Sequence, residues 1–145
     1  MRRLQSPGIS AMIGIDTNVL LRLLVRDHEE QVRVVEHFIT TRFSKDDPGY
    51  VSRVVIAETA WVLKDVYGYD RKQIAAAIRA VVNVSELQME SAAEIDTAIA
   101  DFERSSAGFT DCLLARTNLA AACEHTITFD RKAAKLTGFK LLTVG

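Results

Sequence analysis

The order of apolar segments along the chain limits the fold more than any other feature of the sequence. Short segments with the pattern of buried strands lie at 12–16, 50–52, 86–89, 125–129 and 139–144. Amphipathic helical patterns separate them, at 18–25, 28–42, 53–68, 71–83, 91–104, 111–123 and 130–136. Strands that alternate with helices pair in parallel, because the helix returns the chain to the end of the sheet where it began. The sequence therefore predicts an α/β sandwich around a mainly parallel sheet.

Length and charge narrow the class of protein further. The chain has 145 residues, of which 48% are hydrophobic and 26% charged, which is enough for one domain with its own core. That domain is expected to span residues 12–145. Residues 1–11 are basic and unlike the rest, so they are interpreted as an extension from an upstream start or a remnant of cloning. The net charge of −1 excludes histone-like binding of nucleic acid. It leaves open a local basic patch and metal-mediated phosphate binding.

The cysteines and the apolar runs indicate a cytoplasmic protein. Cys112 and Cys123 fall on one predicted helix at positions that a disulfide cannot join, and both are expected to be buried small hydrophobes. Free thiols are typical of a reducing compartment. No apolar run approaches the roughly 18 residues that a membrane-spanning helix needs, so no membrane association is expected.

Four acidic residues stand where an α/β fold builds its site. Asp16 and Asp130 follow predicted strands, and sites in such folds form outside the carboxyl ends of the strands. Asp111 opens a predicted helix, and Glu58 is predicted to lie within the apolar band of another. Each acid also has a structural explanation: helix capping for the three aspartates, and a solvent-exposed helix edge for the glutamate.

The joint pattern of the four acids indicates metal chemistry. If they converge, like charges within about 4–6 Å of one another raise their pKa values, and a hard cation would stabilise the cluster. Mg²⁺ and Mn²⁺ prefer such oxygen ligands and keep several waters. A carboxylate-held metal lowers the pKa of a bound water and binds a phosphate oxygen. Because the sequence has no glycine-rich phosphate loop, hydrolysis of a phosphodiester fits better than use of a nucleoside triphosphate.

Four segments resemble the motif regions of a known family. They are MIGIDTNVLLRLL, VSRVVIAETAWVL, GFTDCLLA and TFDRKAAKL, and they are similar in order and spacing to those of PIN-domain ribonucleases. The resemblance is greatest to VapC-type toxins of type II (VapBC) toxin–antitoxin systems. It implies a three-layer α/β/α sandwich with a central, mainly parallel sheet. It also implies that Asp16, Glu58 and Asp111 bind the metal, with Asp130 as a fourth acid.

The same resemblance implies an activity and its partners. The expected activity is Mg²⁺-dependent endonucleolytic cleavage of RNA, often a tRNA or ribosomal RNA, with Mn²⁺ able to substitute. A VapB-type antitoxin is expected to block the pocket, a homodimer is expected, and operator DNA would be contacted only through the antitoxin. Asn18 and Thr128 match polar positions that support the acidic pocket. Arg53 and Arg131 are the candidates for binding RNA phosphates, being near predicted strand ends.

Two other functions remain open as alternatives. A non-catalytic PIN-like protein that binds RNA or acts as a scaffold would share the fold, although the intact acids argue against it. A receiver-like signalling domain has a similar element order, but would carry paired acids after its first strand and a lysine after a late one. Trp61 has three interpretations: core packing, a dimer interface, or a platform on which RNA bases stack.

Overall fold

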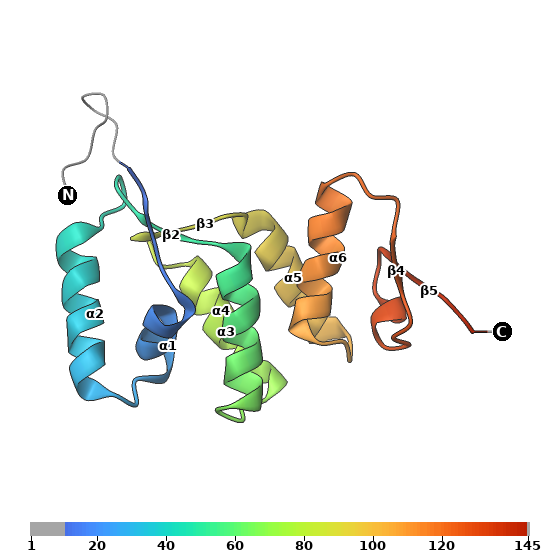
Figure 1. The fold of residues 1–145 in the computed structure, drawn as a ribbon, viewed down its shortest axis with the longest axis horizontal. Helices are drawn as coiled ribbons and strands as arrows, with labels where there is room; N and C mark the ends of the chain where they lie inside the picture. The colour runs from blue at the N-terminus through green and yellow to red at the C-terminus, as the bar shows by residue number, and fades with distance from the viewer. Residues whose placement is uncertain (1–10, 145) are drawn as a thin grey trace.

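The computed structural model describes residues 11–144, so the predicted N-terminal extension, residues 1–11, lies outside the described part except for Ala11. The helices are α1 (Thr17–Val25), α2 (Glu29–Arg42), α3 (Arg53–Asp65), α4 (Arg71–Val82), α5 (Ala92–Arg104) and α6 (Phe109–Ala120). The strands are β1 (Ile13–Gly14), β2 (Gly49–Val51), β3 (Leu87–Met89), β4 (Thr126–Thr128) and β5 (Phe139–Leu141). The helix expected at 130–136 is a single 3₁₀ turn, η1 (Ala133–Lys135). The predicted order of strands and helices is confirmed (Figure 1).

Every pairing between the described strands is parallel, which confirms the α/β class. β1, β2 and β3 form one sheet in that order, with Ile13 opposite Gly49 and Gly49 opposite Leu87. β4 and β5 form a second sheet of two strands, with Thr126 opposite Phe139. The central sheet thus holds three of the five strands, and the other pair lies beside α6 at the C-terminal end of the molecule (Figure 1).

Contacts with α6 hold the second sheet in its place. The Asn118 side-chain amide in α6 donates a hydrogen bond to the Thr126 hydroxyl in β4 at 2.8 Å. Gly138, at the start of β5, has a φ of +94°, and a Cβ added there would lie 2.9 Å from a methyl group of Leu119. Only glycine fits this close approach without strain. As a consequence, Asp130 at the end of β4 is positioned by α6, the helix that carries Asp111.

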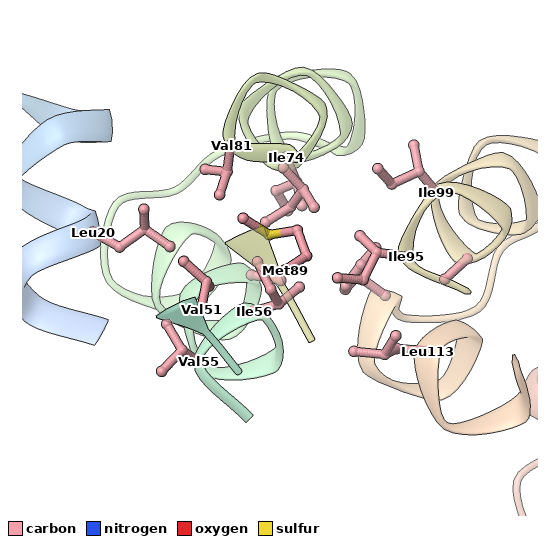
Figure 2. Packing of buried hydrophobic residues seen from close by; sticks show 14 of the residues in the cluster. Leu20, Val51, Val55, Ile56, Ile74, Val81, Met89, Ile95, Ile99 and Leu113 are labelled. Atoms are coloured by element: carbon pink, nitrogen blue, oxygen red, sulfur yellow. The ribbon is translucent and has the colours of Figure 1, made fainter. Parts of the chain in front are cut away.

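The core lies between α3 and α4 and around the strands β2 and β3. In Figure 2, Val51 and Met89 of these strands are surrounded by Ile56 of α3 and Ile74 of α4. All four side chains are buried, and burying a side chain of this size stabilises the fold by about 1.5–3 kcal/mol. The core therefore fixes the rotation of α3 about its axis, and with it the face on which Glu58 lies.

Two local predictions differ from the structure, and one alternative is confirmed. Asp16 is the N-cap of α1, as its structural explanation required, since its carboxylate accepts the Thr17 backbone N–H. α6 begins at Phe109, two residues before the predicted start at 111. Cys112 is buried as predicted, but Cys123 is exposed, because α6 ends at Ala120 and the chain turns before reaching it.

No helix within residues 11–144 combines the length and the apolar character that crossing a membrane requires.

Candidate functional site

Two of the predicted acids are connected through one buried threonine. Asp16 ends the segment that follows β1, and its carboxylate accepts the backbone N–H of Thr17 at 2.7 Å. The Thr17 hydroxyl donates to Oε1 of Glu58 at 3.0 Å, which joins the start of α1 to α3. Thr17 itself is buried. The sequence did not single out Thr17 as a site residue, although its place directly after a strand-end acid was the available signal.

Glu58 lies on the exposed side of α3, so the prediction that it sits within a buried apolar band is wrong. Its neighbours one turn away on the same side, Val54 and Trp61, are themselves exposed. The buried face of α3 consists of Val55, Ile56, Thr59, Ala60 and Leu63. The alternative of an exposed helix edge is the correct one, and a stripe of apolar residues beside Glu58 faces solvent.

The other two acids interact through their charges. Asp111 is half-buried in the first turn of α6, and burial raises the pKa of its carboxyl group above the usual value. The nearby negative charge of Asp130 raises this pKa further. A carboxylate that is partly desolvated beside a second carboxylate is stabilised by a cation, which removes the repulsion between them.

Asp130 is held by contacts with its own loop. Its carboxylate accepts the backbone N–H groups of Lys132 at 2.8 Å and Ala133 at 3.2 Å, although the N-cap of η1 is Lys132 and not Asp130 as predicted. The Thr128 hydroxyl accepts the backbone N–H of Asp130 at 3.0 Å. Asn18 lies on the exposed side of α1, in a shallow hollow that it shares with Arg22 and His28. Thr128 thus contacts one of the four acids, whereas the hollow at Asn18 is lined by none of them.

The four acids form two pairs in place of one cluster. Within residues 11–144, no group of three acidic, histidine or cysteine side chains is close enough to hold a metal ion jointly. One pair is Asp16 with Glu58, joined by Thr17, and the other is Asp111 with Asp130. Mg²⁺ is commonly bound by only one or two carboxylates together with waters and substrate phosphates. The oxygen donors of either pair therefore fit a hard divalent cation, although a four-acid cage is not formed.

One of the two candidate RNA-binding arginines has acidic partners. The Arg53 guanidinium lies 3.0 Å from Glu94 and 3.4 Å from Glu90. Arg131 is exposed, and among the described residues no ion pair involves it. Of the two arginines predicted to contact phosphates, Arg131 is the one whose charge is available to a ligand.

Arg71, which sequence reasoning missed, secures the loop that leads to Asp111. Its Nη2 lies 2.7 Å from the carbonyl oxygen of Phe102, 2.9 Å from that of Ser105 and 2.8 Å from that of Ala107. The guanidinium also lies over the Phe102 ring, 3.8 Å from its centre. These contacts fix the backbone just before Gly108, where α6 begins. Backbone carbonyls accept irrespective of residue type, so no sequence pattern indicates this role.

Replacing Arg71 is expected to loosen that loop. In Arg71→Ala, the loss of charge-assisted hydrogen bonds to backbone carbonyls should lower the free energy of unfolding by about 2–3 kcal/mol. Urea denaturation of both proteins measures this difference. The neighbouring exposed residue provides the control, since Lys72→Ala should unfold at nearly the wild-type urea concentration. Equal midpoints for the two variants would show that Arg71 does not secure the loop.

Comparison with known proteins identifies the family of the chain. The family model of the PIN domain matches residues 13–139, a range that includes all four acids. The chain therefore belongs to the PIN-domain family, and the resemblance seen in the four sequence segments is confirmed. A curated protein named VapC ribonuclease, from Aquifex aeolicus (strain VF5), is 29% identical to it over 126 residues. That alignment covers 87% of this chain and 92% of the relative.

Proposed function

We propose that this chain is a metal-dependent endoribonuclease toxin of a toxin–antitoxin pair, which hydrolyses phosphodiester bonds in RNA. Membership of the PIN-domain family and the similarity to a VapC ribonuclease support the proposal. The observation that carries it is the half-buried Asp111 carboxylate beside the charge of Asp130. Such a pair is unfavourable by itself, and it becomes favourable when a cation binds between the charges.

The residues of the chain would have separate tasks in this reaction. Asp16 and Glu58 would offer oxygen ligands as one pair, and Asp111 and Asp130 as a second pair. The Thr17 hydroxyl orients Glu58 by donating to Oε1, and the Thr17 N–H fixes the Asp16 carboxylate. When bound, Mg²⁺ or Mn²⁺ supplies a water of lowered pKa and neutralises charge on the phosphate.

The proposal includes the partners that the resemblance to VapC-type toxins implies. These are a VapB-type antitoxin, a tRNA or ribosomal RNA substrate, and a second copy of the chain in a homodimer, all in the cytoplasm. Operator DNA would be bound only through the antitoxin. Residues 12–145 would act as one catalytic unit. Arg131 is the better candidate for an RNA phosphate, because Arg53 is paired with Glu90 and Glu94.

Removal of the metal tests the proposal directly. The purified protein, freed of any co-purifying partner, is incubated with total cellular RNA in Mg²⁺, in Mn²⁺ and in EDTA. Discrete fragments are expected with either metal and none with EDTA, because the carboxylate pairs cannot neutralise the phosphate by themselves. Sequencing of the fragment ends then identifies the RNA and the cleaved bond. Cleavage that persists in EDTA would contradict a metal-dependent reaction. Bound metal without cleavage of any RNA would favour the non-catalytic alternative.

A further inference from the structure

An exposed aromatic side chain stands next to the acidic residues on α3. Trp61 lies one turn after Glu58 on the same side of the helix, and 58% of its surface is open to solvent. The interpretation of Trp61 as a core residue is therefore excluded. A large indole left in water is unfavourable compared with one that packs against a partner, since aromatic side chains bury large apolar areas when they do. The exposure of Trp61 therefore needs an explanation other than core packing.

Trp61 forms part of the wall of a cavity that also reaches Asp111. The cavity has a volume of about 470 Å³ and lies between α3, the start of α4 and the start of α6. Its wall includes Trp61, Lys64 and Asp65 from α3, Tyr69 from the loop before α4, and Asp111 from α6. Pockets for small ligands commonly have volumes of about 300–1,000 Å³. The cavity therefore has room for one nucleotide beside the carboxylate that the proposed reaction needs.

We propose that this cavity is a subsite for one base of the RNA substrate, with Trp61 as its stacking platform. The inference rests on the proposed ribonuclease function. The indole offers a flat apolar face on which any base can stack. The Asp65 carboxylate is an acceptor for the N–H groups at a base edge, and Lys64 is a donor for the adjoining phosphate. A base held there would place the neighbouring phosphodiester near Asp111.

The composition of the cavity favours a base over a protein partner. Its wall includes five charged residues, together with the aromatic residues Trp61, Tyr69, Phe102 and Phe109; the charged residues are Lys64, Asp65, Asp70, Arg71 and Asp111. The fully buried centres of protein interfaces are depleted in charged residues. Charged groups next to an exposed aromatic face can bind the edge of a splayed RNA base that stacks on that face. A second copy of the chain covering Trp61 is the competing explanation.

The chain contains a single tryptophan, so its fluorescence reports on this position alone. The wild-type protein is titrated in EDTA with a mixed-sequence RNA hexamer, under conditions in which cleavage is not expected. Stacking should quench the emission in a saturable manner. In parallel, binding of a fluorescein-labelled hexamer is measured by anisotropy for Trp61→Leu, Trp61→Phe and Val66→Ala. Val66 serves as the control, because it is exposed at the end of the same helix but does not line the cavity.

The variants separate stacking from a general structural effect. Trp61→Leu should bind the hexamer about tenfold to a hundredfold more weakly, which is the loss expected for one base–aromatic stack. Trp61→Phe should restore most of the affinity, and Val66→Ala should bind like the wild type. Equal affinity of Trp61→Leu and the wild type would overturn the inference. The inference would also be overturned if the Trp61 emission changed with protein concentration but not with RNA, while sedimentation showed a dimer.

The two proposals fail in different ways. Metal-dependent cleavage by the wild type without quenching would leave the ribonuclease function standing and remove the base subsite. Saturable quenching without cleavage in any metal would support the base subsite in a protein that binds RNA but does not cut it.

Discussion

The Asp111→Asn variant is expected to cleave RNA at least about 10²–10³-fold more slowly than the wild type, the effect of removing one preorganised charged group from a reacting centre. Asp16→Asn should lose a similar factor, because both residues supply a charged oxygen to the proposed metal. Asparagine keeps the shape of the side chain, and at position 16 it also keeps the ability to cap α1. The measurement is the initial rate of cleavage of a labelled RNA in Mg²⁺. If both variants cut at the wild-type rate, these carboxylates are not the site.

Thermal unfolding in EDTA provides the control for folding. Burial and Asp130 raise the pKa of Asp111 in the folded protein above its unfolded value, so the folded state binds more protons between those two values. Stability therefore falls as the pH rises through that window. Asp111→Asn removes this ionisation, and its melting temperature at pH 7 should be above that of the wild type. The advantage should disappear below the unfolded pKa of about 3.9. A lower melting temperature at pH 7 would indicate a misfolded variant and invalidate its kinetics.

Asp101→Ala is expected to lower the free energy of unfolding by about 3 kcal/mol, the largest stability effect predicted here for a single residue. Asp101 in α5 is 8% exposed. Its carboxylate receives two hydrogen bonds from Arg116 of α6, Nε to Oδ2 at 2.6 Å and Nη2 to Oδ1 at 3.0 Å. Breaking a buried ion pair costs about 3–5 kcal/mol because it leaves a charge unpaired. The lower end of this energy range applies, because 25% of the Arg116 side chain is exposed to solvent. Urea denaturation measures the loss.

A second ion pair from α5 is the matched control. Glu103 pairs with Arg79 at 2.9 Å on the open surface, where such pairs contribute little. Glu103→Ala should therefore unfold at the wild-type urea concentration. The same midpoint for Asp101→Ala and Glu103→Ala would show that the Asp101–Arg116 pair does not hold α5 to α6.

The order of elements was predictable because apolar periodicity reflects burial directly. The rotation of α3 about its own axis was not predictable, and Glu58 and Trp61 show why. A period of 3.6 residues identifies an apolar face, but it does not distinguish a face buried in the core from one that is left for a ligand. The residues next to Glu58 were apolar, so the pattern indicated burial. In the structure the apolar stripe beside Glu58 faces solvent. The cavity at Trp61 therefore indicates a role for this stripe other than core packing.

The contacts between residues of the candidate site were not predictable from the sequence, for a different reason. Thr17 and Glu58 are 41 positions apart, and their hydrogen bond depends on how α1 packs against α3. The partners of Arg71 are backbone carbonyls, which every residue carries. The ends of strands did indicate Asp16 and Asp130, because the chain must leave a parallel sheet at its carboxyl edge. Residue type indicated the candidate groups, while the pairing of those groups required tertiary structure.

The exclusively parallel pairing of the described strands has a consequence for how the protein folds. A parallel pair cannot begin as a tight hairpin, since a long crossover must separate its two strands. β1 can meet β2 only after the chain that forms α1 and α2 has folded back, and closing such a loop has an entropic cost before any strand contact is made. Helix packing should accordingly precede sheet formation. A nascent chain that has not yet reached β4 carries Asp16 and Glu58 but lacks Asp130, so the second acidic pair is completed only after β4 has been synthesised.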